Sequence, residues 1–315
     1  MNRLRTAVVG AGYLGRFHAL KYAAHPECEL VAVVDADAQR AQAVADECGC
    51  KAFTDAAELP GAVDAASMAT PTRLHHALAL PLLEAGIHML IEKPMTTTLA
   101  EADALIAAAR ARECVLQVGH LERFNPAMVA AASEIRQPRF IESHRIAPFN
   151  PRGADVSVVL DLMIHDIDLI LELVDSPLER LDASGARVIS EDIDIANARL
   201  GFADGCVANV TASRVSPKAE RRLRLFQENA YFALDLQAGT LDVQRRRPDA
   251  AGPPTMDQIT REQRSPGRSD ALADEINAFV RAIHEGSRPV VSGDDGRRAL
   301  AAAIEIGRQL NRNPA

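Results

Sequence analysis

The stretch Thr6-Ala7-Val8-Val9-Gly10-Ala11-Gly12-Tyr13-Leu14-Gly15, near the start of the chain, decides the fold. Its first four residues form a short apolar run typical of a buried strand, and a helical pattern follows through Tyr22. The glycines between strand and helix keep the spacing G-x-G-x-x-G, which in this place is the fingerprint of a dinucleotide-binding turn. The stretch therefore predicts the first strand, turn and helix of a Rossmann domain.

Each part of this turn has its own role in holding a dinucleotide. Gly10 permits the tight turn, Gly12 lets a pyrophosphate approach the backbone, and Gly15 lets the helix pack closely against the strand. The N–H groups at the start of the helix, around Tyr13 and Leu14, then face the phosphates together with the positive end of the helix dipole. We therefore expect these five residues to form part of the cofactor site.

An acidic residue after the second strand indicates which dinucleotide binds. The apolar run 30–34 ends at Asp35, 20 residues beyond Gly15. An acid at this place accepts hydrogen bonds from the ribose hydroxyls of NAD and repels the 2′-phosphate of NADP. The alternative is an acid that merely ends a strand, and Asp37 is better suited to cap the next helix. The sequence thus predicts NAD as the cofactor.

Strands and helices alternate through the rest of the first 121 residues, which indicates a parallel, doubly wound sheet. Thr70 precedes a proline and should close its strand in extended geometry. His75 would lie in the first turn of the following helix, near the cofactor edge, or be a simple partly exposed histidine. We expect helices over residues 38–48, 74–85 and 99–112, and strands over 52–53, 62–69, 87–90 and 115–118.

The run Ile91-Glu92-Lys93-Pro94 places two ionisable side chains directly after a buried strand. Ligands of open α/β sheets bind outside the carboxyl ends of the strands, and a lysine there can hold a substrate oxygen. The alternative is a surface ion pair before a proline turn. Lys93 is therefore a candidate for chemistry.

From Gly119 the pattern changes to successive strands, which favours a largely antiparallel sheet in a second domain. The predicted fold class is α/β, with an N-terminal Rossmann doubly wound parallel sheet in residues 1–121 and a C-terminal α+β domain in residues 122–315. We expect strands over 139–147, 179–189, 194–202, 206–214, 222–227, 230–236 and 240–245, a long loop over 248–269, and helices over 155–174, 270–285 and 294–311.

The helix expected over residues 155–174 is apolar on nearly every face and should be largely buried. It nevertheless carries four polar residues whose spacings of four, three and four put them on one stripe: Asp161, His165, Asp168 and Glu172. Three interpretations are open: Asp161 orients His165 as a proton acceptor, the two form a structural hydrogen bond, or they share a metal ion. No third ligand cluster is evident, so we predict no metal site.

The composition is that of an ordinary globular protein. Of the 315 residues, 48% are hydrophobic and 25% charged, and the formal net charge is -8. This acidic balance favours neither nucleic acid nor a membrane surface as a partner. The N-terminus does not resemble a signal peptide, no apolar run is long enough to span a bilayer, and five cysteines without metal-ligand spacing suit a reducing compartment. We therefore expect a cytoplasmic protein.

Four motifs in this order resemble the glucose-fructose oxidoreductase, inositol dehydrogenase and rhizopine family (Gfo/Idh/MocA) over essentially the whole chain. They are the glycine turn at 10–15, Thr70-Pro71-Thr72-x-x-His75, Glu92-Lys93-Pro94 and Asp161-x-x-x-His165. The resemblance implies a tightly bound nicotinamide cofactor and oxidation or reduction of a sugar or polyol carbon. It also implies an open-faced C-terminal sheet that binds substrate and forms homodimers or homotetramers.

The resemblance implies roles for individual residues as well. Lys93 and His165 would contact the reacting hydroxyl, and Asp161 would support the site. The cofactor site would further include five residues along the first domain and just beyond it: Thr70, His75, Glu92, Lys93 and Arg123.

Residues 119–126 and 161–166 most resemble the branch of this family that acts on UDP-N-acetylglucosamine. That resemblance implies oxidation of the sugar at C3 to a 3-keto sugar nucleotide, on the way to a diamino-sugar lipid A. The small-molecule substrate would then be a UDP-sugar, with Asn150, Arg152 and Arg214 as candidate contacts, the arginines for the diphosphate. The alternatives are an inositol or free-sugar dehydrogenase of the same family, or an NAD(H)-binding regulator without chemistry.

Overall fold

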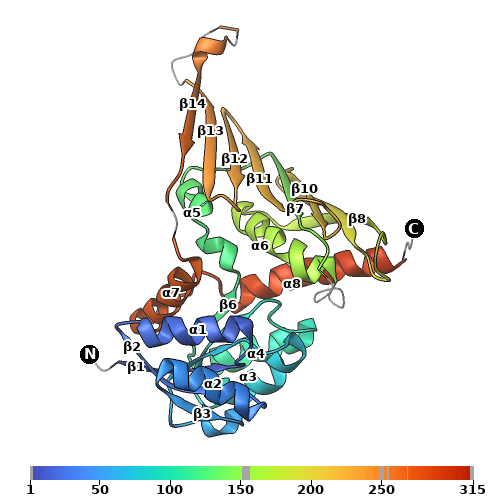
Figure 1. Ribbon diagram of the computed structural model, residues 1–315. Coiled ribbons are helices and arrows are strands. Elements are labelled where there is room, and N and C mark those ends of the chain that lie inside the picture. Colours follow the sequence, from blue (N-terminus) through green and yellow to red (C-terminus); the bar gives the residue numbers. More distant parts are fainter. Residues whose placement is uncertain (1–2, 151–156, 248–251, 254, 268, 313–315) are drawn as a thin grey trace. The chain divides into compact units, whose positions relative to one another are not determined.

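The computed structural model describes residues 3–150, 157–247, 252, 253, 255–267 and 269–312. The chain groups into two compact units, which can be followed by colour in Figure 1. The first unit contains Met1–Leu121 and Asp270–Leu300, and the second contains Glu122–Ser269 and Ala301–Ala315. The grouping of Asp270–Leu300 with the first unit departs from the predicted domains, which placed that segment in the second.

The first unit is built on a six-stranded parallel sheet, as predicted. Its strands are β1 (Leu4–Val9), β2 (Cys28–Val34), β3 (Lys51–Phe53), β4 (Ala65–Met68), β5 (His88–Glu92) and β6 (Leu116–Gly119). Their order is β3-β2-β1-β4-β5-β6, and every neighbouring pair is parallel. The strand order reverses between β1 and β4, and ligands of such sheets bind at this switch point, outside the carboxyl ends of the strands.

Helices alternate with these strands. They are α1 (Tyr13–Ala24), α2 (Ala38–Cys48), α3 (His75–Glu84) and α4 (Leu99–Ala111). Asp37 accepts hydrogen bonds from the N–H groups of the first turn of α2, which confirms its predicted role as a cap. Thr98 and Glu101 form a reciprocal capping box at the start of α4.

The segment 270–300 joins the first unit because α7 (Ala271–Glu285) buries its apolar face there. Ile276 and Phe279 have no exposed surface and belong to one hydrophobic core with Val8 of β1. Most of the stability of a helix in a protein comes from burying such an apolar face. This packing, which the position of α7 in the sequence does not reveal, explains the departure from the predicted domains.

The second unit contains an eight-stranded, mostly antiparallel sheet (Figure 1), so the predicted fold class is confirmed. Its strands are β7 (Phe140–Ile146), β8 (Leu178–Ala186), β9 (Ile195–Phe202), β10 (Val207–Ser213), β11 (Glu220–Gln227), β12 (Ala230–Asp235), β13 (Thr240–Arg246) and β14 (Ile259–Arg264). Their order is β14-β13-β12-β11-β7-β10-β9-β8, and only β7 and β10 pair in parallel. Along β13, Leu241 and Val243 are buried whereas Asp242 is exposed, which is the pattern of a sheet with one covered face.

Residues 259–264 form an edge strand, so the prediction of a loop over 248–269 was wrong for this part. β14 pairs only with β13, in antiparallel register. Its central residues 260–263 are polar or charged and exposed, so the alternation that indicates a strand is missing from the sequence. Charged residues are common on exposed edge strands because they discourage pairing with another chain.

The helix predicted over 155–174 consists of a π-helical segment, η5 (Val159–Met163), followed by α6 (Ile164–Leu173). Its predicted start, 155–156, lies outside the described residues. The apolar side chains of α6 are buried, as predicted, and the helix packs on β7 and β10. α5 (Pro126–Ala132) packs on β12 and β13, and α8 (Gly293–Arg312) carries the chain from the first unit into the second. No helix in the described part of the chain is both long and apolar enough to cross a membrane.

Candidate active site

Two of the three glycines in the first turn are required by the packing of the protein itself. Gly10 has a φ of +99°, in the left-handed region that favours glycine, and a Cβ there would lie 2.7 Å from the carbonyl carbon of Ala69. A Cβ at Gly15 would lie 1.7 Å from the carbonyl oxygen of Gly10. These glycines therefore allow the tight turn and the close approach of α1 that the sequence predicted.

Gly12 differs because its neighbours in the described structure do not require a glycine. A Cβ at Gly12 would meet no described atom within 4 Å. Gly12 is the N-cap of α1, without a side-chain cap and without an acidic residue in the first turn, where Tyr13 and Leu14 are exposed. The first N–H groups and the positive dipole end of α1 are thus uncovered. An approaching phosphate explains a glycine at this position.

Asp35 lies just beyond β2, beside the glycine turn. One carboxylate oxygen accepts a hydrogen bond from the N–H of Ala11 at 2.8 Å, and the other accepts one from the N–H of Asp37 at 2.9 Å. Nη1 of Arg40 is 3.7 Å from the same carboxylate. The backbone donors hold the carboxylate in place, and its remaining lone pairs can accept bonds from ribose hydroxyls. This geometry fits NAD.

A cavity of about 430 Å³ lies at the carboxyl ends of β1, β2 and β4. Gly10, Gly12, Asp35 and Thr70, all predicted cofactor residues, line it. Its other walls include residues for which the sequence offered no motif: Ala36, Arg40, Thr54, Asp55, Leu74 and Leu78. Apolar side chains and an arginine plane suit the flat face of a purine base, so the cavity fits the adenosine end of the dinucleotide.

His75 joins the two motifs that follow β4 and β5. Its side chain is buried, with Nε2 2.8 Å from the carbonyl oxygen of Thr70 and Nδ1 3.1 Å from that of Pro94. Burial lowers the pKa of His75, and the bonds to these carbonyls act in the opposite direction. The interpretation of a simple exposed histidine is therefore wrong, because His75 braces two loops at the cofactor edge. Its contact with the cofactor stays a prediction.

Glu92 ends β5 at this same edge of the sheet, and Lys93 comes next in the chain. Oε1 of Glu92 is 3.0 Å from Nε2 of His18, and Glu92 pairs in register with Gly119 of β6. A Cβ at Gly119 would lie 2.9 Å from the carboxyl carbon of Glu92, so the glycine makes room for the carboxylate. Lys93 follows directly and is partly exposed. The structure thus fixes Glu92 tightly beside the lysine predicted to act on the substrate.

In the second unit, Arg123 forms ion pairs with two residues of the predicted polar stripe, Asp168 and Glu172. Its Nε and Nη2 donate to Asp168 at 2.6 and 2.9 Å, and its Nη1 is 2.8 Å from Glu172. Burial opposes the charged guanidinium, but the two carboxylates outweigh it and raise the pKa of Arg123. Because all three guanidinium nitrogens contact carboxylates, the contact of Arg123 with the cofactor stays a prediction.

A second buried ion-pair network involves α6, and the sequence reasoning missed it. Arg145 of β7 donates to Asp166 at 2.8 and 3.1 Å and to Glu122 at 2.8 Å. Arg145 and Asp166 are almost completely buried. The available signal was an aspartate within an otherwise apolar helix, next to His165. The network fastens α6 to β7 and thereby fixes the position of His165.

Asp161 and His165 lie one helical turn apart, on either side of the junction between η5 and α6. Both are partly exposed, whereas Asp166 and Asp168 are buried. Single π-helical turns occur frequently at functional sites. The structure brings Asp161 and His165 together on one helix, and it places Glu92 and Lys93 in the other unit. The convergence of these two pairs on one substrate stays a prediction.

Arg214, a predicted substrate contact, is held within the second unit. Its Nε donates to Asp194 at 2.9 Å and its Nη2 to Oγ of Ser190 at 3.0 Å, and the residue is buried. These bonds explain an arginine at the end of β10 without a diphosphate. Asn150 is exposed, and Arg152 lies outside the described residues. The substrate roles of all three stay predictions.

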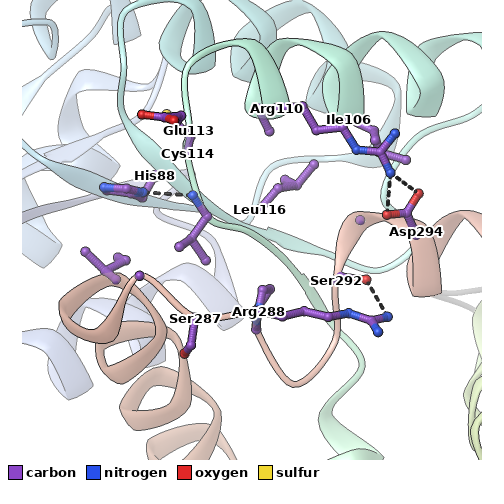
Figure 2. Close-up of a pocket in the computed structure, with 16 residues that line it drawn as sticks. His88, Ile106, Arg110, Glu113, Cys114, Leu116, Ser287, Arg288, Ser292 and Asp294 are labelled. Atoms are coloured by element: carbon purple, nitrogen blue, oxygen red, sulfur yellow. Dashed lines mark hydrogen bonds and ion pairs between the residues drawn. The ribbon is translucent and has the colours of Figure 1, made fainter.

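Another cavity, of about 380 Å³, lies at the amino ends of β5 and β6. Figure 2 shows the residues that line it. Its arginines are engaged by neighbouring side chains, Arg110 by Asp294 and Arg288 by Ser292 (Figure 2). Strand polarity in open α/β sheets favours ligands at the carboxyl ends. The cavity around Gly12 and Asp35 is therefore the candidate cofactor site.

Two family models match most of the chain. Residues 4–120 match the oxidoreductase family with an NAD-binding Rossmann fold, and residues 128–233 match the GFO/IDH/MocA C-terminal domain.

Individual relatives match over nearly the full length. The chain is 42% identical over 308 residues to UDP-N-acetylglucosamine 3-dehydrogenase of Acidithiobacillus ferrooxidans, with 97% of each chain covered. It is 28% identical over 321 residues to inositol 2-dehydrogenase of Rhizobium meliloti, with 95% of this chain and 94% of the relative covered. A solved structure of UDP-N-acetylglucosamine 3-dehydrogenase from Acidithiobacillus ferrooxidans superposes with a TM-score of 0.91 at 40% identity and covers 99% of both chains.

Proposed function

This chain belongs to the Gfo/Idh/MocA family of NAD-binding oxidoreductases, and we propose that it oxidises the C3 hydroxyl of UDP-N-acetylglucosamine to a ketone. The observation that carries the choice of substrate is the 42% identity, over 97% of both chains, to a dehydrogenase of that name. Identity to the inositol 2-dehydrogenase of Rhizobium meliloti is 28%. The product would be a 3-keto sugar nucleotide, which we assign to the synthesis of a diamino-sugar lipid A.

In the proposed reaction, His165 removes the hydroxyl proton, and Asp161, one turn away on the same helix, orients the imidazole. Lys93 stabilises the negative charge that develops on the oxygen. The carboxylate of Glu92, fixed by His18 and by the space at Gly119, balances the charge of the neighbouring lysine. NAD, when bound, accepts the hydride that leaves the sugar carbon.

We further infer how the substrate is held and where the enzyme works. Asn150, Arg152 and Arg214 contact the UDP-sugar, and the arginines bind its diphosphate. The exposed face of the second unit's sheet, which carries residues such as Asp242, forms a homodimer or homotetramer. The enzyme is cytoplasmic, where sugar nucleotides and NAD are available.

A substrate comparison tests the proposed function. NADH formation should be measured with UDP-N-acetylglucosamine, UDP-glucose, myo-inositol and glucose at equal concentrations. We expect the highest kcat/KM for UDP-N-acetylglucosamine, with a 3-keto product identified by mass spectrometry after borodeuteride trapping. A higher kcat/KM for myo-inositol would overturn the substrate in favour of an inositol dehydrogenase. NAD binding without turnover of any of the four would favour a regulator.

The variant Lys93→Ala tests the assignment of the catalytic lysine. Loss of the stabilising amine should lower kcat by about 10²- to 10⁴-fold, while the Kd for NAD changes little. Lys51→Ala is the matched control, because Lys51 is an exposed lysine of β3 in the same unit. If Lys93→Ala and Lys51→Ala turned over substrate equally fast, Lys93 would have no part in the reaction.

A further inference from the structure

A cluster of polar side chains is buried behind Glu92 in the first unit. Its members come from α1, β4, β5, β6 and α7: His18, Tyr22, Ser67, Glu92, Gln117 and Glu275. All except Glu92 have no exposed surface. Burying polar groups is unfavourable unless they are hydrogen-bonded, so a cluster of this size behind the catalytic edge indicates a role in the site.

Hydrogen bonds run through this cluster in one direction, toward Glu92. The hydroxyl of Tyr22 is 2.9 Å from Oγ of Ser67, which is itself 3.1 Å from Nδ1 of His18. Nε2 of His18 is 3.0 Å from Oε1 of Glu92. A carboxylate can only accept, so Nε2 of His18 donates, and Nδ1 of the neutral imidazole accepts from the Ser67 hydroxyl. Both ring nitrogens of His18 therefore have a partner within the cluster.

Oε1 of Gln117 has no hydrogen-bond partner among the described residues, and Glu275 of α7 is the acidic member of the cluster that lacks a donor. Neither of its carboxyl oxygens has a hydrogen-bond partner among the described residues. A ligand atom from each of Glu275, His18 and Glu92 nevertheless lies within 4.8 Å of the other two. Since Glu275 makes no direct hydrogen bond to these residues, a separation of at most 4.8 Å suits one bridging water. The backbone carbonyl of Glu275 accepts from Nε2 of Gln117 at 3.1 Å, which fixes α7 at this place.

The charge of Glu275 follows from its surroundings. α1 presents His18 and Tyr22 to it, β5 presents Glu92, and no arginine or lysine of the described chain forms an ion pair with it. Burial and the negative charge of Glu92 raise the pKa of Glu275 well above its usual value. A second carboxylate in this cluster would be uncompensated, so Glu275 is a neutral acid that can donate a hydrogen bond.

We propose that His18 and Glu275 are positioning residues that hold Glu92 as a carboxylate beside Lys93. His18 donates directly from Nε2, and the neutral acid of Glu275 donates through a single water. The arrangement keeps one negative charge, in a fixed place, next to the lysine at the reacting hydroxyl. This inference rests on the proposed role of Lys93 in turnover.

A divalent cation is the competing explanation, because a histidine and two carboxylates form a common ligand set. The two explanations differ in the proton on Nε2 of His18. A metal ligand needs the lone pair of Nε2, whereas donation to a carboxylate 3.0 Å away requires a proton on that atom. The two explanations also differ in the charge of Glu275, which must be ionised to bind a metal.

Infrared spectroscopy of the purified full-length protein tests the charge of Glu275 without reference to activity. The difference spectrum between the wild type and Glu275→Gln at pH 6, above the usual pKa of a glutamate, should contain the C=O band of a neutral carboxylic acid. A carboxylate band in its place would overturn the proposal. So would one equivalent of a divalent metal in the wild-type protein that is absent from Glu275→Gln. Neither readout depends on the substrate, so failure of the proposed function would leave this test intact.

Paired variants of His18 test the positioning role. His18→Gln keeps a side-chain N–H that can reach Glu92, and His18→Leu does not. We expect His18→Leu to lower kcat on the order of 100-fold, as a displaced catalytic group does, with a change below threefold in the Kd for NAD. The acid limb of its pH profile should move to higher pH, and His18→Gln should restore most of kcat. Equal kcat and equal pH profiles in the two variants would overturn the proposal.

Discussion

Two buried carboxyl groups in this protein, Asp194 and Glu275, have opposite surroundings. Asp194 lies in the second unit, between β8 and β9, and Glu275 lies in α7 of the first unit. Both have no exposed surface. The oxygens of Asp194 accept bonds from three backbone N–H groups, from a hydroxyl and from a guanidinium, contributed by Val188, Ile189, Ser190 and Arg214. Those of Glu275 accept none from the described residues.

The comparison shows that burial alone does not decide the charge of a carboxyl group. Burial raises the pKa in both cases, but the Ser190 hydroxyl and the backbone donors reverse this effect, and the pKa of Asp194 lies well below its usual value. The pKa of Glu275 lies well above its usual value, because only burial and the charge of Glu92 act on it. Asp194 is therefore a permanent anion that fixes a loop, and Glu275 is an acid whose proton is available to the site.

The largest expected effect is the loss of stability when the side chain of Asp194 is removed. Asp194→Ala leaves the buried guanidinium of Arg214 without its carboxylate and three N–H groups without an acceptor. Removing one partner of a buried ion pair destabilises a protein by about 3–5 kcal/mol. We expect a loss of this size in urea-induced unfolding. Asp192→Ala is the matched control in the same loop, because Asp192 is exposed, and its effect should stay within about 0.5 kcal/mol.

The fold was largely predictable because its signals are local. The glycine turn, the strand that ends at Asp35 and the helix capped by Asp37 are each encoded in a few consecutive residues. β14 was missed because its exposed edge needs no apolar alternation. The place of α7 was missed because the burial of Ile276 and Phe279 depends on a core formed by distant strands.

Candidate site residues could be predicted where they belong to a local sequence motif. Their hydrogen-bond partners could not be predicted, because these come from distant parts of the chain. Lys93 and His165 stand out because an ionisable side chain in an apolar setting is visible in the sequence. The donors that reach Glu92 and Asp166 lie 74 and 21 residues away from them, and no spacing rule predicts such pairs. The same holds for Arg214, whose carboxylate partner Asp194 lies 20 residues away, and its contact with a diphosphate stays a prediction.

The second expected effect is that the stability contributed by Glu275 depends on pH. The pKa of Glu275 is raised above its unfolded value of 4.5, so its contribution to stability is fully present below that pH and is lost as the pH rises. Between pH 5 and pH 7, the wild type should therefore lose stability relative to Glu275→Gln in urea-induced unfolding.

Asp194→Asn is the comparison variant, because the pKa of Asp194 is shifted in the opposite direction. The pKa of Asp194 is lowered below its unfolded value of 3.8, so the stability that it contributes is present above that pH and is lost as the pH falls. Its difference from the wild type should therefore be constant between pH 5 and pH 7. A constant difference for Glu275→Gln over the same range would mean that Glu275 ionises alike in both states, and the contrast between the two groups would disappear.

The smallest expected effect concerns Asp35, which is intermediate between the two. Two backbone N–H groups hold its carboxylate, as at Asp194, but no buried cation binds it, and lone pairs remain for a ligand. Asp35→Ser should raise the Kd for NAD about 10-fold, or about 1.4 kcal/mol, by removing a charged acceptor from the ribose hydroxyls. It should also narrow the preference for NAD over NADP, because the repulsion of a 2′-phosphate is lost. Isothermal titration with both dinucleotides measures the two effects.

Asp37→Ala is the control that separates a direct contact from a disturbed backbone. Asp37 lies two residues further on and caps α2, and removing a cap destabilises a protein by about 1 kcal/mol. Its side chain has no place in the cavity around Gly12, so the Kd for NAD should stay near that of the wild type. If Asp37→Ala weakened NAD binding as much as Asp35→Ser, the effect would come from the loop that both residues order. Asp35 would then resemble Asp194, a carboxylate that fixes the backbone, and its remaining lone pairs would have no ligand to explain them.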